Sequence, residues 1–304
     1  MRNEYAFIIP FNRCDLHKKG AWRYKKTLAR PEWWKKRAKI LKEYTLKSLK
    51  NQKSQIFSIW GLFLKQDMVN AKPVIDVLNS HNAHIAWGSN NETLLEGCEE
   101  VLAHYHNKCK NLVMIHLDSD DMYASNTISF LRKQEITPGS VFYYSSGYIY
   151  GVFDRRLATF DAPKAPPPFV AMVFPNEVLK SYDAWLKFRT RFKMNCYHHQ
   201  VHHCKKRKKM PHGFYCYMMH DENVVSAWSN KHTYTKIGKF IRERPKKVKI
   251  LNRFGIDYER VRHEGMEISN KSVQQPQVPI PYGEVMEYPC RRDSYSCNRN
   301  CGSD

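Results

Sequence analysis

The sequence has no long hydrophobic run. No apolar stretch approaches the roughly 18 to 20 residues that a helix needs to span a bilayer. The N-terminus, Met1 to Tyr5, lacks both a long apolar stretch and a cleavage site of small residues, so no signal peptide is predicted. The nine cysteines are scattered and odd in number. Without an export signal, free thiols are expected rather than a disulfide framework, which predicts a cytoplasmic protein.

Acidic residues are scarce, with 29 Asp and Glu against 50 Lys and Arg, a net charge of +21. Residues 18–53 carry 14 Lys or Arg and two Glu, and residues 187–209 carry nine Lys or Arg and no acid. Residues 66–186 are mildly acidic, with 14 acids and nine bases. Basic flanks attract polyanions such as nucleic acid, anionic membrane surfaces or phosphorylated sugars. The alternative is a solvated surface kept for solubility.

The chain does contain enough hydrophobic residues for a folded core, 42% of the sequence with 13% aromatic. Its first part, about 130 residues, alternates between short hydrophobic runs and segments with helical spacing. The predicted strands are 5–10, 55–64, 84–87 and 112–117, and the predicted helices are 31–49, 73–80, 92–106 and 125–132. This alternation predicts βαβ units and an α/β fold, with a mainly parallel, Rossmann-like central sheet flanked by helices.

The pattern changes after residue 135. An aromatic stretch at 141–153 predicts a hairpin that turns near Ser146 and Gly147. The other predicted segments are an extended proline loop at 162–168, a strand at 169–174, a helix at 176–194, a basic loop at 201–211 and a strand at 214–219. We therefore expect three parts: residues 1–135, an irregular C-terminal half at residues 136–267, and a polar tail with Pro and Cys at residues 268–304.

Three carboxylates, Asp118, Asp120 and Asp121, follow the predicted strand 112–117 at once. In parallel sheets ligands bind beyond the carboxyl ends of the strands, and carboxylate oxygens at that edge suit a divalent cation. Like charges this close repel one another, so the cluster needs a cation or a basic partner. The alternative is an acidic turn that caps the next helix.

Asn12 and Asp67 are polar residues that also follow predicted strands. The carboxyl ends of parallel strands meet at one edge of a sheet, so both residues are expected near the three aspartates. Simple capping of a strand end is the alternative for each. The coincidence of polar residues at three strand ends is the strongest structural indication of a ligand site.

A later segment, 196–204, is rich in cysteine and histidine, in the order Cys-x-His-His-x-x-His-His-Cys, and His212 and Cys216 follow it. These residue types bind zinc and occur here at a zinc-like density, but their spacing matches no common zinc finger. A structural zinc site and a polar, His-rich loop are both open interpretations.

Two segments taken together resemble a known class of enzymes: Ser48-Leu-x-x-Gln52 before the second predicted strand, and Asp118-Ser-Asp-Asp121 after the fourth. They are similar to the nucleotide-sugar-binding half of GT-A glycosyltransferases. The resemblance to a family of rhamnosyltransferases within that class rests on further segments: Phe11-Asn12, Pro167-Pro168-Phe169 and His220-x-x-Asn223. The chain departs from the family pattern in the basic loop from Phe11 to Trp33 and at Asp221, where the family has glycine.

The resemblance implies a GT-A fold, a nucleoside diphosphate sugar as donor, and Mn²⁺ or Mg²⁺ as cofactor. Residues 1–135 would be the nucleotide-sugar-binding half, and residues 136–267 the acceptor-side half of the same catalytic domain. The implied nucleotide-sugar-binding residues are Asn12, Arg13, Asp67, Asp118 and Arg155, and the implied metal ligands are Asp118, Asp120, Asp121 and His220. The cation would neutralise the charge that develops on the leaving diphosphate.

Inverting transfer needs a general base on the acceptor hydroxyl. Asp221, Glu222, Asp161 and Asp183 are the candidates, of which Asp221 is favoured. We therefore expect a metal-dependent glycosyltransferase whose acceptor is a glycan or a polyanion such as hydroxymethylated DNA, and Asp120→Ala should abolish turnover with the fold intact. The alternative is a non-catalytic nucleic-acid-binding protein that uses only its basic surface.

Overall fold

The computed structural model describes residues 1–11, 30–88, 98–161, 169–194, 204–220 and 237–260. The chain divides into two compact units, Met1–Gly265 and Met266–Asp304. The second unit lies outside the described residues, as do the predicted proline loop at 162–168 and residues 92–97 of the predicted helix 92–106. None of the helices in the described ranges has the length and apolar character that crossing a membrane requires.

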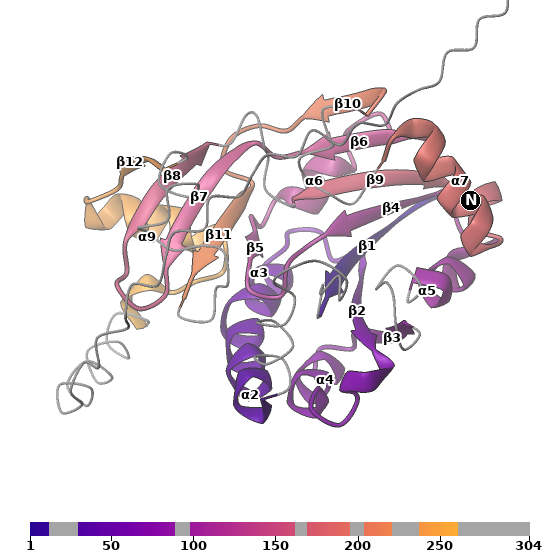
Figure 1. Cartoon of the computed structure of the whole chain (residues 1–304). Helices are drawn as coiled ribbons and strands as arrows, with labels where there is room; N and C mark the ends of the chain where they lie inside the picture. Colours follow the sequence, from indigo (N-terminus) through magenta and orange to yellow (C-terminus); the bar gives the residue numbers. More distant parts are fainter. Residues whose placement is uncertain (12–29, 89–97, 162–168, 195–203, 221–236, 261–304) are drawn as a thin grey trace, which may run out of the picture. The chain divides into compact units, whose positions relative to one another are not determined.

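The first sheet has seven strands in the order β10-β6-β9-β4-β1-β2-β3 (Figure 1). Their bounds are β1 Asn3–Pro10, β2 Ser58–Leu64, β3 His84–Gly88, β4 Asn111–His116, β6 Ser140–Tyr143, β9 Val170–Pro175 and β10 Lys206–Lys209. Only β9 runs antiparallel to its neighbours in this sheet. The predicted α/β fold with a mainly parallel central sheet is therefore confirmed.

Helices cover both faces of this sheet. One face carries α2 (Pro31–Ile40), a π-helical turn (Leu41–Thr45), α3 (Leu46–Lys50) and α4 (Lys72–Asn79), and the other carries α5 (Cys98–Tyr105) and α7 (Tyr182–Phe192). Along β1, Phe7 and Ile9 pack in the first layer and Ala6 and Ile8 in the second, since successive side chains of a strand point to opposite faces. Burial on both faces explains why these strands are continuous hydrophobic runs.

The order of the strands creates a switch point beside β1. The chain runs from β1 to β2 and β3 on one side, then crosses to β4 on the other side of β1. In open α/β sheets the ligand crevice lies at such a point, beyond the carboxyl ends of the two strands. The amide of Leu117 continues the pairing one residue past β4, donating to the carbonyl of Ile8 at 3.0 Å. The three aspartates follow directly, so they lie at this switch point.

A second sheet of five strands, in the order β12-β8-β7-β11-β5, occupies part of the C-terminal half that we expected to be irregular. Its strands are β5 Met122–Tyr123, β7 Ser146–Gly151, β8 Leu157–Asp161, β11 Tyr215–Met219 and β12 Ile237–Phe240. A hydrophobic cluster joins it to α9 (Arg244–Asn252) through residues such as Tyr150, Met218 and Leu251.

The predicted hairpin over 141–153 is wrong, because β6 belongs to the first sheet and β7 to the second, where β7 pairs with β8. Gly147 was interpreted as a turn residue, but it lies within β7, where the backbone of β11 comes close to it. A Cβ at this position would lie 2.6 Å from the carbonyl oxygen of Tyr215 on β11. Backbone crowding, and not a reversal of the chain, accounts for the glycine.

The predicted basic loop at 201–211 is wrong over Lys206–Lys209, which form β10 and pair with β6. The segment contains no hydrophobic residue, so its sequence gives no signal of a strand. An edge strand needs only backbone hydrogen bonds on one side, and lysine is common there. The predicted helix at 125–132 is present as α6 (Thr127–Leu131), with Asn126 rather than Ser125 as its N-cap residue.

The predicted helix at 176–194 begins with a 3-10 turn (Asn176–Val178), and the regular helix α7 follows. Its N-cap is Ser181, whose hydroxyl accepts a hydrogen bond from the amide of Ala184 at 3.2 Å. The predicted helix at 31–49 is continuous through its π-helical turn. These segments confirm the predicted helices with small shifts of their ends.

Candidate functional site

The acidic loop, Asp118–Asp121, connects β4 of the first sheet to β5 of the second. The amide of Asp121 donates to the carbonyl of Asp118 at 3.1 Å, which closes a turn. Thr45, in the π-helical turn, donates its hydroxyl to the carbonyl of Ser119 at 3.1 Å. Beyond the loop, β5 pairs with β11. The loop is therefore held by the first sheet, the helical layer and the second sheet.

The Ser-Leu-x-x-Gln motif holds the exit of this loop. The hydroxyl of Ser48 accepts a hydrogen bond from the amide of Tyr123 at 3.3 Å. The side chain of Gln52 donates to the carbonyl of Ala124 at 2.7 Å and accepts from the amide of Ile128 at 3.2 Å. Both motif residues are buried. The two segments that carry the family resemblance are therefore joined in space, and the first one positions the second.

Asp120 is the centre of a buried ion cluster. Its Oδ2 accepts from Arg37 Nη1 at 2.7 Å and lies 2.8 Å from His220 Nε2. The exposed fractions of the three side chains are 15% for Asp120, 8% for Arg37 and 0% for His220. Burial opposes the ionisation of Asp120, but the Arg37 guanidinium and His220 outweigh it and hold the pKa of this carboxyl well below its usual range.

Arg37 is the residue that sequence reasoning missed. It lies three residues after Trp34 and four before Leu41, on the apolar face of α2, and its guanidinium lies 5.0 Å from the ring centre of Trp33. An arginine at a core-facing helical position requires a buried anionic partner. That signal was readable in the helical spacing of 31–49, together with the expectation that the aspartates need a basic partner.

The pKa of Asp121 is shifted in the opposite direction to that of Asp120. Its Oδ1 accepts from the amide of Met218 on β11 at 2.9 Å, and its Oδ2 is buried without a hydrogen-bond partner among the described residues. Burial, followed by the charges of Asp120 and Asp118, raises the pKa of Asp121 well above its usual value. Asp121 therefore favours its neutral form and fastens the loop to the second sheet.

Asp118 is more open to solvent than Asp120, with 28% of its side chain exposed. Its Oδ1 lies 3.0 Å from Nε2 of His116, the last residue of β4. The carbonyl of His116 in turn accepts from the hydroxyl of Tyr123 at 2.9 Å. Asp118 is thus oriented by the strand it follows and is accessible to a bound molecule.

The other predicted site residues lie in different places. Asp67 ends a short 3-10 helix (Lys65–Asp67) directly after β2, which puts it at the carboxyl edge of the first sheet. Arg155 lies in the turn between β7 and β8, with a φ of +58°, and its Nη1 donates to the hydroxyls of Tyr44 and Tyr150 at 3.5 Å. Asp161 is exposed at the end of β8. The residues outside the described ranges are Asn12, Arg13, Asp221 and Glu222.

The predicted His- and Cys-rich zinc segment lies mostly outside the described residues, which include Cys204, His212 and Cys216 from it. Cys204 and Cys216 are buried free thiols. Burial raises the pKa of both, which opposes the thiolate form that zinc binding requires. His212 packs edge-on against the ring of Tyr148. These three residues give no support to a zinc site.

Asp120 and His220 are the described residues best placed to hold Mn²⁺ or Mg²⁺. A carboxylate oxygen and an imidazole nitrogen 2.8 Å apart are suitable donors for Mn²⁺, and both reach one point. Among the described ranges, no group of three or more His, Cys, Asp or Glu side chains is arranged around a metal position. Arg37 also engages the same oxygen, so a cation and this guanidinium would compete for Asp120.

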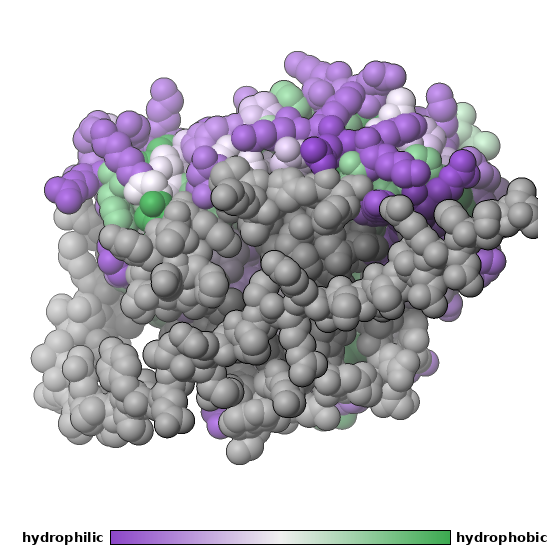
Figure 2. All heavy atoms as spheres, turned by 45° about the horizontal axis from the view of Figure 1, so that its top comes forward, coloured by the Kyte–Doolittle hydropathy of each residue, from purple (hydrophilic) through white to green (hydrophobic). Residues whose placement is uncertain are grey.

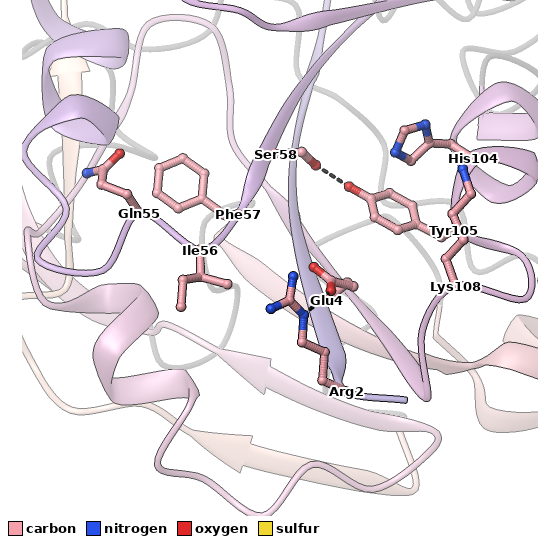
Figure 3. Close-up of a pocket in the computed structure, with 9 residues that line it drawn as sticks. All are labelled: Arg2, Glu4, Gln55, Ile56, Phe57, Ser58, His104, Tyr105 and Lys108. Atoms are coloured by element: carbon pink, nitrogen blue, oxygen red, sulfur yellow. Dashed lines mark hydrogen bonds and ion pairs between the residues drawn. The ribbon is translucent and has the colours of Figure 1, made fainter.

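A cavity of about 480 Å³ lies at the other end of the first sheet (Figure 3). It is lined by Arg2, Glu4, Gln55, Ile56, Phe57, Ser58, His104, Tyr105 and Lys108. Within it Arg2 pairs with Glu4 at 2.6 Å, and Ser58 contacts the hydroxyl of Tyr105. None of the predicted site residues lines it. Since it opens at the amino ends of β1 and β2, it does not share the switch-point crevice.

No family model matches the chain, and no curated protein matches it. Among solved structures, TarS residues 1–349 from S. aureus is 12% identical over 71% of this chain and 60% of that one, with a TM-score of 0.36. TarS in complex with UDP is 12% identical over 83% and 70%, with a TM-score of 0.32. The 4-diphosphocytidyl-2C-methyl-D-erythritol synthase from Anaerococcus prevotii is 15% identical over 82% and 94%, with a TM-score of 0.37. Similarities this low carry no argument about activity.

Proposed function

We propose that the protein is a glycosyltransferase that binds a nucleoside diphosphate sugar at the carboxyl ends of β1 and β4, beside the acidic loop. The observation that supports this most is the place of the loop. Three carboxylates, one of them in a buried ion cluster, follow the strand next to the switch point, where α/β sheets bind their ligands. The resemblance to GT-A enzymes is based on the same loop and on the motif that holds it, and the resemblance to rhamnosyltransferases adds Phe11-Asn12, Pro167-Pro168-Phe169 and His220-x-x-Asn223.

Each carboxylate has a distinct task in this proposal. Asp118, accessible and oriented by His116, would accept hydrogen bonds from the ribose hydroxyls of the donor. Asp120 is kept ionised by Arg37, and with His220 it would hold a divalent cation. When bound, that cation neutralises the charge on the leaving diphosphate. Asp121, favouring its neutral form, would hold the loop on β11.

In the transfer, the acceptor hydroxyl oxygen forms a bond to the anomeric carbon of the sugar. The bond from that carbon to the diphosphate oxygen breaks, the nucleoside diphosphate leaves with the electron pair, and a base takes the hydroxyl proton. Asp221 and Glu222 follow His220 directly in the chain, so they are the bases nearest the cluster in sequence. Asp183 is a weaker candidate, because it is exposed in the first turn of α7 and pairs with Lys187 at 2.7 Å.

A thermal-shift screen of nucleoside diphosphate sugars, rhamnose donors included, tests the proposal with and without Mn²⁺. A donor at about 100 times its dissociation constant should stabilise the protein by about 2.7 kcal/mol. Asp118→Asn should lose this stabilisation and keep the melting temperature of the ligand-free protein, because its side chain is partly exposed.

The matched control is Asp76→Asn on α4, where an exposed carboxylate pairs with Lys72. This variant should respond to the donor as the wild type does. Absence of stabilisation by any nucleoside diphosphate sugar would reject the proposal and favour the non-catalytic alternative. An unchanged donor response in Asp118→Asn would remove Asp118 from the binding site.

A further inference from the structure

The edge of the first sheet is an unbroken run of exposed positive charge. Lys205 and the four residues of β10, Lys206–Lys209, are all exposed. On one side β10 pairs with β6, and on the other it has no partner strand among the described residues. The outer backbone N–H groups of β10 therefore pair with no strand among the described residues, and they lie beside five cationic side chains.

The charges lie on both faces of this edge, because the side chains of a strand alternate. Lys206 Nζ lies 5.6 Å from the ring centre of Phe192, and Lys208 Nζ lies 5.8 Å from that of Phe142. Contacts of this kind hold the ammonium groups against the rings, and Lys206 Nζ also donates to the carbonyl of Pro138 at 3.2 Å. The cations are thus partly ordered before any partner binds.

The end of α7 extends the same surface. Arg191 and Lys193 are exposed there, and the thiol of Cys204 donates to the carbonyl of Lys193 at 3.1 Å, which brings Lys193 next to Lys205. The sequence from Lys187 to Lys209 contains no acidic residue to neutralise these charges. We call the seven residues Arg191, Lys193 and 205–209 the basic edge. Figure 2, which turns the top of Figure 1 forward, shows hydrophilic residues gathered along this part of the molecule.

The basic edge leads to the candidate site. β10 is parallel to β6, and both β6 and β4 are antiparallel to β9, so Lys209 lies at the same end of the sheet as the acidic loop. Three strand spacings separate β10 from β4, a distance of about 14 Å. The chain continues from β10 into β11, which ends beside His220. A polyanion lying on the basic edge would therefore extend toward the acidic loop.

We propose that the basic edge binds the phosphate backbone of a nucleic acid, and that this nucleic acid is the acceptor in the transfer proposed above. The acceptor role depends on that proposed function, whereas the binding surface does not. Phosphates require positive charges and N–H donors without base-specific contacts, and the basic edge supplies both. Protection of an edge strand against aggregation would need one or two lysines and would not require Arg191 and Lys193.

The test compares two variants of equal net charge. Lys205→Gln/Lys208→Gln/Lys209→Gln removes three cations from the basic edge, and Lys239→Gln/Lys246→Gln/Lys249→Gln removes three exposed cations from β12 and α9, beside the second sheet. The affinity for a short fluorescein-labelled DNA duplex is measured by anisotropy between about 50 and 200 mM KCl. The edge variant should bind more weakly, with a slope of log affinity against log salt reduced by about 2 to 3, and the control should keep the wild-type slope.

Equal losses in the two variants would overturn the proposal, since net charge alone would then explain binding. So would an absence of DNA binding at about 50 mM KCl, or displacement of DNA by an anionic glycan such as heparin at a lower charge concentration. The donor thermal shift separates this proposal from the proposed function. Edge-dependent DNA binding in a protein that binds no nucleoside diphosphate sugar would keep the binding surface and remove the acceptor role.

Discussion

The acidic loop and the Lys209 end of the basic edge lie at the same end of one sheet, and the two regions differ in the sign of their charge and in their exposure to solvent. In the loop, Asp120 keeps 15% of its side chain exposed and has two buried partners, Arg37 and His220. On the basic edge, Lys205–Lys209 are exposed. A buried charge must be compensated by specific neighbours, and so the fold depends on it. Exposed charges contribute little to stability, so an unbroken run of them requires an explanation other than the fold.

Asp120→Asn should have the largest effect on stability. It leaves the buried Arg37 guanidinium without its anion, and breaking a buried pair in this way costs about 3 to 5 kcal/mol. Urea unfolding of the metal-free protein measures this change. The expectation that Asp120→Ala would leave the fold intact is therefore revised, because the sequence did not show that this carboxylate is buried against Arg37.

The pH dependence of stability tests whether the ionised Asp120 causes the stability loss in Asp120→Asn. The pKa of Asp120 is lowered in the folded protein, so its contribution is present above the unfolded pKa of about 4 and fades as the pH falls below it. The loss of unfolding free energy caused by Asp120→Asn should therefore become smaller as the pH falls below about 4. Asp118→Asn is the control in the same loop and should cost about 1 kcal/mol or less. Equal penalties in the two variants would contradict the contrast between buried and accessible carboxylates.

Arg37→Met tests the competition for Asp120 Oδ2. The variant should itself be less stable, by less than the about 3 to 5 kcal/mol that a fully unpaired buried charge costs, because Asp120 keeps His220 as a partner. Mn²⁺ should restore part of that stability, and it should raise the melting temperature of the variant more than that of the wild type. A response to Mn²⁺ that is the same in both proteins would show that Arg37 and the cation do not share this oxygen.

Asp121→Asn should change stability in the opposite direction to Asp120→Asn. The pKa of Asp121 is raised in the folded protein, so its contribution is present below about pH 4 and is lost as the pH rises toward the folded pKa. The wild type should therefore lose stability relative to Asp121→Asn at about 1.4 kcal/mol per pH unit within that window. Unfolding curves at a series of pH values measure the difference. A pH-independent difference would show that the pKa of Asp121 is the same in the folded and unfolded protein, and a slope of the opposite sign would show that it is lowered like that of Asp120.

The smallest change in stability is expected on the basic edge. The triple variant Lys205→Gln/Lys208→Gln/Lys209→Gln should keep its unfolding free energy within about 0.5 kcal/mol, as surface substitutions do. The control triple at Lys239, Lys246 and Lys249 should behave in the same way. A loss of several kcal/mol in the edge variant would mean that these lysines support β10, and it would remove the contrast between the two regions.

The central strands of the first sheet were predictable because they are buried on both faces, so their sequences are hydrophobic runs such as Leu112–Leu117. β10 was not predictable. Its backbone pairs with a neighbouring strand, but all its side chains are exposed, so its sequence lacks the hydrophobic residues from which a strand is predicted. The second sheet depends on contacts between distant segments, for example β11 with β5 and β7. The spacing of hydrophobic residues within one segment does not predict pairings between strands that are far apart in the sequence.

In the candidate site, the family resemblance implied that Asp120 and His220 act together, and the structure brings them within 2.8 Å although 100 residues separate them. Their roles as metal ligands stay predictions. The divergent states of Asp120 and Asp121 were not predictable, because adjacent aspartates look alike in a sequence. Burial against Arg37 on one side and against β11 on the other separates their pKa values.

The acidic loop is one of the covalent connections between the two sheets, and groups from both sheets hold it. Thr45 anchors it from the helical layer of the first sheet, and Met218 anchors it from the second. A disturbance that loosens only the second sheet would release Asp121 and carry His220 away from Asp120. The carboxylates of the acidic loop would then lose their arrangement while the first sheet remained folded. If the proposed function is right, donor binding would be lost at a lower temperature than the fold itself.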